Sequence, residues 1–250
     1  MEQQQTTAVE SEAGLKEEMK TESILRQVTH SAVILTADLL DPCKTNPPPM
    51  TASSGHNGTR VKNEAEYPTL RRFCLMRQDI VEPLLVFCNH AIRMRDTRSC
   101  TVAVRLFISL IPEFRPIEGP PTTLVNPDDG ATAEQRNKAW QEPPNAAPAI
   151  REFISRDVLK ACVTSFNEPY FVEVQKELAS LIAAIVVHYG ALTTTPRDML
   201  LSLPNINVDE LNRLTPYIAK PGSHTRQQRA IVLELLKELK GLVEEQEADT

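Results

Sequence analysis

The sequence predicts an all-α fold: an α-solenoid of HEAT-like antiparallel helix pairs with long proline-rich loops. Apolar residues recur at helical spacing between the loops, and no convincing run alternates as a strand would. The chain has only 8 glycines and 5% aromatic residues, which argues against glycine-rich sandwiches, barrels and nucleotide-binding folds. Of its 19 prolines, thirteen lie within 41–68 and 112–148. Proline interrupts regular structure, so we predict loops over 41–66 and 112–148.

The chain opens on a polar, glutamine-rich, acidic stretch, and we expect residues 1–21 to be disordered. A helix is predicted over Glu22–Leu40, ended by Asp41-Pro42. Its apolar stripe, which we expect to be buried, consists of Ile24, Leu25, Val28, Ala32, Leu35 and Leu39.

A short helix after Tyr67-Pro68 is predicted to contain Leu70, Phe73 and Leu75. A stronger helix follows over about 78–94. Asp96-Thr97 then provides a cap for another helix that runs through Ile111 and is stopped by Pro112. The buried positions expected in these last two helices are Ile80, Val81, Leu84, Leu85, Cys88, Ala91 and Ile92, followed by Cys100, Val104, Phe107, Ile108 and Ile111.

The clearest helix pair is predicted over Ala147–Gly190, where two amphipathic segments meet at an Asn-Glu-Pro corner. Asn167 is the expected N-cap of the second helix, Pro169 fits its first turn, and Gly190 fits its C-terminal end. Such a short corner makes the two helices antiparallel. Stacked pairs of this kind build scaffolds that bind macromolecules.

Three shorter helices are predicted to follow, over 195–203, 208–217 and 225–243, and an acidic tail over 244–250. The residues between the disordered start and this tail, 22–243, are taken as one helical region. Two hairpins of about 35–45 residues fit the HEAT repeat, whose period is about 40–47 residues. The competing interpretation is an irregular helical bundle.

The net charge of −6 disfavours a general nucleic-acid coat, but the charge is unevenly distributed. Between Arg71 and Arg105 the chain has seven arginines against three acidic residues, a local excess of +4. Solvated helix faces explain most clusters of this kind. The alternative is a contact surface for an acidic partner, and its candidate residues are Arg71, Arg72, Arg93, Arg95, Arg98 and Arg105.

Recognisable catalytic chemistry is missing from the sequence. Neither glycine-rich phosphate-binding pattern occurs, and there is no zinc-ligand spacing. Cys88 and His90 are two positions apart, so on a helix they point away from each other. Cys162 and His188 could form a nucleophilic pair, but Cys162 lies on an apolar stripe. We therefore expect no enzymatic activity, no cofactor and no metal.

The five cysteines show no even pairing, and no signal peptide precedes the first helix, which suggests a reducing compartment. The longest apolar run, 178–189, is shorter than the roughly 20 residues that a membrane-spanning helix needs. We expect a protein that is soluble and has no membrane partner.

Several of these segments, in order, resemble the carboxyl-terminal part of the exportin-5 family of karyopherin-β nuclear transport receptors. They are SILRQVTHSAVILTADLLDP, YPTLRRFCLMRQDIVEPLLVFCNHAIRMRDTRSC, VLKACVTSFNEPYFVEVQKELASLIAAI, TPRDMLLSLP and TRQQRAIVLELLKELKG. The resemblance covers most of 23–241 and is weak in 112–148. It implies a HEAT solenoid that takes protein or structured small RNA cargo out of the nucleus with Ran-GTP, and a location in both nucleus and cytoplasm.

The chain is much shorter than members of that family and resembles only about their last fifth. Ran contacts in karyopherins lie mainly in amino-terminal repeats that have no counterpart here. The resemblance therefore implies a part of an export receptor, in which charged residues on one helix of each pair face the cargo. The alternative is a helical HEAT adaptor or scaffold with no role in transport.

Overall fold

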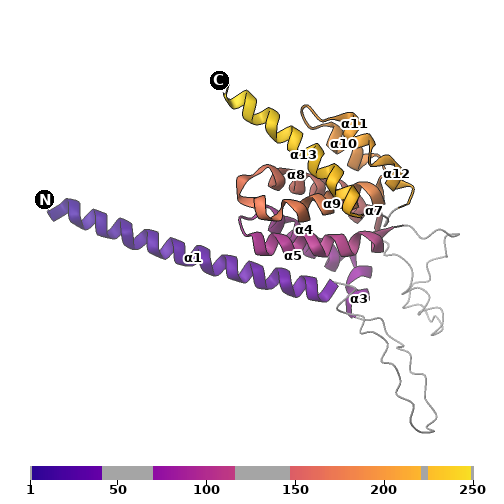
Figure 1. Cartoon of the computed structure of the whole chain (residues 1–250). Coiled ribbons are helices and arrows are strands. Elements are labelled where there is room, and N and C mark those ends of the chain that lie inside the picture. The colour runs from indigo at the N-terminus through magenta and orange to yellow at the C-terminus, as the bar shows by residue number, and fades with distance from the viewer. Residues whose placement is uncertain (1, 41–69, 116–146, 221–224, 249–250) are drawn as a thin grey trace, which may run out of the picture.

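The computed structural model describes residues 2–40, 70–115, 147–220 and 225–248, and within these ranges every regular element is a helix (Figure 1). The predicted loop over 41–66 and most of the one over 112–148 lie outside the described residues. The elements in chain order are α1 (Glu2–Leu40), α3 (Leu70–Met76), α4 (Gln78–Arg93), α5 (Thr97–Leu110), η1 (Ile111–Phe114), α7 (Ala147–Phe153), η2 (Ile154–Val158), α8 (Leu159–Asn167), η3 (Pro169–Val174), α9 (Gln175–Tyr189), α10 (Thr195–Leu201), α11 (Val208–Asn212), α12 (Thr215–Ile218) and α13 (Thr225–Ala248).

The helices stack in two layers, as the prediction of an α-solenoid requires. One layer runs α1, α5, α9 and α13, each helix in contact with the next. The other layer holds α4 and α8, which contact each other and cover α5 and α9 respectively. Each hairpin of the chain, α4 with α5 and α8 with α9, therefore places one helix in each layer. Figure 1 shows this order, with α9 between α5 and α13.

Helix α9 is at the centre of the core because it is apolar on nearly every side. Nine of its residues are buried, among them Ile182 and Tyr189, and it contacts α5, α8, α12 and α13. The Tyr189 hydroxyl donates to the carbonyl oxygen of Ile111 at 3.1 Å, so the phenol is buried with its polar atom satisfied. The predicted C-terminal stop at Gly190 is confirmed, since this residue is the C-cap of α9.

Several predicted boundaries were displaced by proline or by local capping. Asn167 is the last residue of α8 rather than an N-cap, and the 3₁₀-helix η3 begins at Pro169. The helix expected over 208–217 is divided into α11 and α12, because Pro216 cannot continue the hydrogen bonding of α11. Residues 112–114 of the predicted loop form most of η1, and 147–148 begin α7.

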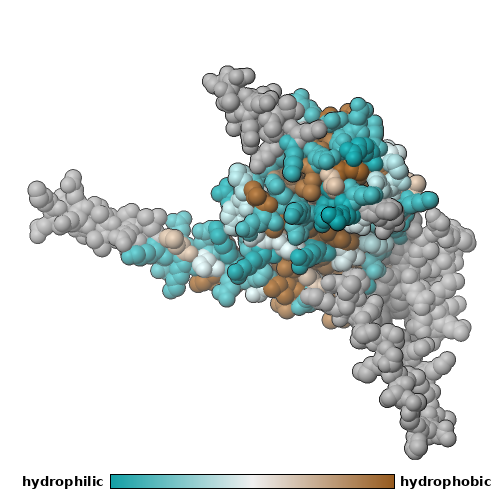
Figure 2. All heavy atoms as spheres, in the orientation of Figure 1, coloured by the Kyte–Doolittle hydropathy of each residue, from teal (hydrophilic) through white to brown (hydrophobic). Residues whose placement is uncertain are grey.

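Helix α1 differs most from the prediction. It begins at Glu2, so residues 2–21 are helical where we expected disorder, and α13 likewise continues through residues 244–248 of the expected acidic tail. The predicted apolar stripe of this helix is only partly buried. Its members Ile24, Leu25, Val28 and Leu35 are exposed, while Ala32 and Leu39 are partly buried and Leu39 packs against the core. Among the described side chains of α1, the buried ones are Thr29, Val33, Thr36, Ala37 and Leu40. Figure 2 shows hydrophobic side chains on the surface along this helix.

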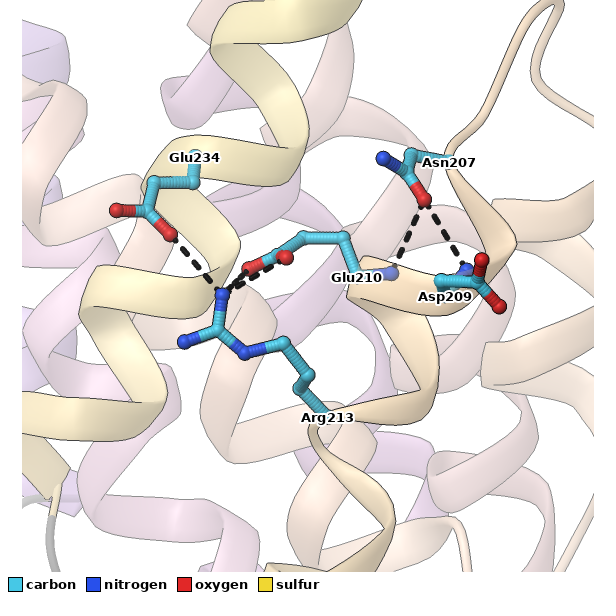
Figure 3. A network of polar contacts seen from close by, with 5 residues as sticks. All are labelled: Asn207, Asp209, Glu210, Arg213 and Glu234. Carbon is cyan, nitrogen blue, oxygen red and sulfur yellow. Dashed lines mark hydrogen bonds and ion pairs between the residues drawn. The ribbon is translucent and has the colours of Figure 1, made fainter.

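The carboxyl-terminal elements are joined to each other by polar contacts at the surface (Figure 3). Asn207 caps α11, its side-chain oxygen accepting from the backbone N–H groups of Asp209 and Glu210. Arg213, just after α11, donates from Nη1 to both carboxylate oxygens of Glu210 at 2.6 and 2.8 Å. The same nitrogen lies 3.3 Å from Glu234 on α13, so a single arginine links α11 to the last helix.

Within the described residues, no helix combines the length and the apolar character that crossing a membrane would require.

Candidate functional site

The corner between α4 and α5 is fixed by a hydrogen-bonded cap. Asp96 is the N-cap of α5, and its carboxylate accepts from the backbone N–H groups of Arg98 and Ser99, as the sequence predicted. The Ser99 hydroxyl also bonds the Asp96 carboxylate and lies 3.1 Å from Nδ1 of His30 on α1. The capped turn therefore holds both the start of α5 and the neighbouring helix in place.

Four of the predicted contact residues surround this corner and are exposed: Arg93, Arg95, Arg98 and Arg105, here called the arginine surface. Arg93 ends α4, while Arg98 and Arg105 lie seven residues apart on α5, two turns or about 10 Å along one face. The Arg95 side chain is 74% exposed, and its Nε lies 4.0 Å from the carboxylate of Glu168. In the described part of the chain, Arg93, Arg98 and Arg105 take part in no ion pair, so their charges are available to a partner.

Arg71 does not belong to this surface, which corrects the prediction. It is 6% exposed, its Nε donates to the carbonyl oxygen of Leu40 at 2.8 Å, and its guanidinium lies 2.9 Å from the Glu113 carboxylate. Arg71 therefore joins the end of α1 to η1, a structural role that the sequence could not show because Glu113 is distant along the chain. The side chain of Arg72, on α3, lies outside the described residues.

Sequence reasoning missed one exposed aromatic residue close to the arginine surface. Tyr170 on η3 is 46% exposed, and η3 packs against α5. The Tyr170 ring packs edge to face against the ring of the buried Phe171, with 5.4 Å between the ring centroids. This contact holds the Tyr170 ring against the start of η3. Glu168, the N-cap of η3, is the residue that approaches Arg95. The sequence feature that could have pointed to Tyr170 is its position directly after Pro169, in the corner between two predicted helices.

The Exportin-5 family model matches residues 1–119 and 139–248, which together make up most of the chain. The chain belongs to the Exportin-5 family. An uncharacterized protein of Schizosaccharomyces pombe is 26% identical over 226 residues, which cover 89% of this chain. The chain spans only 16% of the length of that relative. No solved structure matches the chain.

Burial suppresses the reactivity of three cysteines in the described part of this Exportin-5 family chain. Burial raises the pKa of the Cys88 and Cys100 thiols to about 12. The pKa of Cys162 is also raised well above its ordinary value, mainly because this thiol is completely buried. The thiolate is the nucleophilic form of cysteine, so these residues behave as small hydrophobic groups at neutral pH. Cys88 is buried and His90 exposed, so the two point apart, as their spacing predicted.

His188 does not supply a base to Cys162. Burial, and then the positive charge of Arg115, lower the pKa of His188. No hydrogen bond joins the imidazole to Cys162 within the described residues, and its buried Nδ1 has no partner. Among the described residues, no three histidine, cysteine or acidic side chains are grouped as a metal site would need. The exposed arginines of the α4–α5 corner are therefore the best candidate for a functional site.

Proposed function

We propose that this chain is the carboxyl-terminal HEAT region of a nuclear export receptor and that it contributes a cargo-contact surface. The observation that carries the proposal is the family match over both halves of the chain, together with an exposed arginine surface around one solenoid corner. Cargo would be a structured small RNA or a protein, bound while the whole receptor acts with Ran-GTP. Such a receptor moves between nucleus and cytoplasm, where we expect the chain to be found.

The geometry of the arginine surface suits an extended, negatively charged partner. Arg98 and Arg105 present guanidinium groups along one face of α5, and Arg95 adds a third from the preceding turn. Guanidinium groups bind phosphate oxygens in pairs of hydrogen bonds, and each phosphate neutralised adds to the salt dependence of binding. Tyr170, exposed on neighbouring η3, offers a ring on which an unpaired base can stack.

The proposal is tested with a short double-stranded RNA hairpin that ends in an unpaired loop. Binding is measured by fluorescence anisotropy at several salt concentrations, for the wild-type chain and for Arg93→Glu, Arg95→Glu, Arg98→Glu and Arg105→Glu combined. We expect the variant to lose at least tenfold in affinity, and the slope of log K against log salt to fall by about 1 for each phosphate contact removed.

The matched control reverses four exposed basic residues elsewhere, Arg156, Lys160, Lys176 and Arg226, which gives the same change in net charge. Equal losses in the two variants would mean that net charge alone drives binding. Binding and salt slope unchanged by the reversal at the corner would remove the arginine surface from the proposal. If the corner reversal has no effect and the chain also fails to bind any acidic partner, the alternative of a non-transport scaffold would be favoured.

A further inference from the structure

A second group of basic side chains gathers away from the α4–α5 corner, at the end of η1. It consists of Arg115, Arg151 and His188, here called the η1 basic cluster, and all three are partly buried. They come from separate elements: Arg115 is the C-cap of η1, Arg151 lies on α7 and His188 is near the end of α9. Sequence reasoning linked none of them to one another.

Two hydrogen bonds bring the three residues together. Arg151 Nη1 donates at 2.6 Å to the carbonyl oxygen of Phe114, the residue before Arg115. The Tyr189 hydroxyl donates at 3.1 Å to the carbonyl oxygen of Ile111, at the start of the same 3₁₀-helix, and His188 precedes Tyr189 on α9. Both α7 and α9 contact η1, so the three basic side chains are attached to backbone segments that lie close to these two hydrogen bonds.

The positive charge of this cluster is not balanced within the described part of the chain. The nearby acidic residues face elsewhere: Glu113 pairs with Arg71, and Glu152 accepts a hydrogen bond from Thr195 at 3.0 Å. No ion pair within the described residues includes Arg115, Arg151 or His188. The charge of Arg115 acts on its neighbours instead, contributing to the lowered pKa of His188 after the larger effect of burial.

Two nitrogen atoms of the cluster are buried without a hydrogen-bond partner, Nε of Arg115 and Nδ1 of His188. Buried polar atoms in proteins almost always have a partner, and one left unpaired destabilises the fold. Arg115 Nε always carries a hydrogen and therefore lacks an acceptor, and His188 Nδ1 lacks one whenever it is protonated. A negatively charged acceptor would also compensate the two guanidinium charges.

We propose that the η1 basic cluster binds a phosphate group. Two permanent guanidinium charges match a dianion better than a single carboxylate, and the planar guanidinium pairs with phosphate oxygens. Protonated His188 would supply a third donor. The phosphate could be inorganic phosphate or a phosphorylated side chain, since both present the same oxygens. The proposal is independent of the RNA-binding role assigned to the arginine surface, which involves none of these residues.

The test follows the ¹³Cε1 and imidazole ¹⁵N signals of His188 by NMR while sodium phosphate is added to the full chain. Ionic strength is held constant with sodium chloride, and sodium acetate is titrated separately. We expect a saturable change at His188 with phosphate, at least tenfold weaker binding with acetate, and no saturable change at His90, which is exposed on α4. A phosphate response that does not saturate, or that chloride reproduces, overturns the proposal.

The variant Arg115→Gln is expected to weaken phosphate binding at least tenfold, while Arg156→Gln, which removes an exposed arginine paired with Asp157 on the neighbouring η2, leaves it unchanged. Equal binding by wild type and Arg115→Gln contradicts the site even if phosphate binds. A thermal melt of each variant confirms that it is folded. Titration with phosphothreonine amide then separates the sources: tighter binding than inorganic phosphate indicates a phosphorylated side chain, and equal or weaker binding indicates free phosphate.

Discussion

Helices α1 and α9 lie in the same layer of the solenoid, but they are buried in different ways. Helix α9 has neighbours on both sides in its layer and α8 above it, and nine of its residues are buried. Among the described elements of its layer, α1 has a neighbour on one side only, α5, and it exposes four large apolar residues of its predicted stripe. Amphipathic spacing thus identified both helices, but burial depended on how many neighbours each one has within the described chain.

The contact between α1 and α5 is also more polar than the contacts of α9. Thr29 and Thr36 are among the buried residues of α1, and the Thr36 hydroxyl is satisfied by the carbonyl oxygen of Ala32 at 2.9 Å within the same helix. His30 approaches the Ser99 hydroxyl on α5. A helix held in this way contributes less apolar burial to stability than one enclosed on all sides.

The largest expected difference between the two helices is in the free energy of unfolding. Ile182→Ala in α9 removes a completely buried side chain and should cost about 2–5 kcal/mol. Leu35→Ala in α1 truncates a residue that is 69% exposed and should change stability by less than about 0.5 kcal/mol. Urea denaturation followed by circular dichroism measures both. A cost for Leu35→Ala that approaches that of Ile182→Ala would mean that this face of α1 is covered in solution.

The exposed apolar row of α1 should make the isolated chain associate with itself. Leu25 and Val28 lie three residues apart and Leu35 follows seven residues later, so the three side chains share one face of the helix. Sedimentation velocity should show a concentration-dependent increase in mass that Leu35→Glu reduces severalfold. Lys160→Gln, which changes the net charge by the same amount at an exposed position of α8, should leave association intact. A wild-type chain that stays monomeric at all concentrations would contradict this expectation.

A smaller effect is expected at the capped α4–α5 corner, which also contacts α1. Asp96→Ala removes the acceptor for two backbone N–H groups and should cost about 1 kcal/mol of stability. Asp96→Asn retains a good capping side chain and should cost much less, which separates capping from charge. Thermal unfolding of both variants measures the difference. Equal losses would show that the carboxylate charge beside His30, 4.0 Å away, is the important feature.

The smallest effect concerns pH and the end of α9. Burial lowers the pKa of His188 in the folded chain below its ordinary value of 6.5. As pH falls below about 6.5, the unfolded chain therefore binds a proton that the folded chain does not yet accept, and stability decreases. In phosphate-free buffer, His188→Gln should lose less stability than wild type between pH 7.5 and 5.5, as measured by thermal midpoints.

Much of the fold could be predicted because it depends on local sequence. The spacing of apolar residues in 78–111 and 150–189 located α4, α5, α8 and α9, and the Asp96 cap depends only on residues two and three positions away. The orientation of α1 could not be predicted in this way. Its exposed stripe is more apolar than its buried one, and the face that packs lies against α3, α4 and α5, which are distant in sequence from most of α1.

The candidate site was predicted in part for a similar reason. Clustering in the sequence located the exposed arginines of the α4–α5 corner, since neighbours along a turn are also neighbours in space. The same clustering wrongly included Arg71, whose partner Glu113 lies on another element. Arg115, Arg151 and His188 are widely separated in the sequence, so only the packing of α7 and α9 on η1 brings them together.

The position of Arg71 has a consequence for how variable this chain can be. Its guanidinium contacts Leu40 just before one long connection and Glu113 just before another, while Arg71 itself follows the first of them. The junction is thus formed by residues that flank the connections, not by residues within them. Because the entropy of closing a loop grows only slowly with its length, homologous chains can lengthen or shorten 41–69 and 116–146 at little cost in stability. We therefore expect these two segments to be the places where an inserted tag or reporter domain is tolerated.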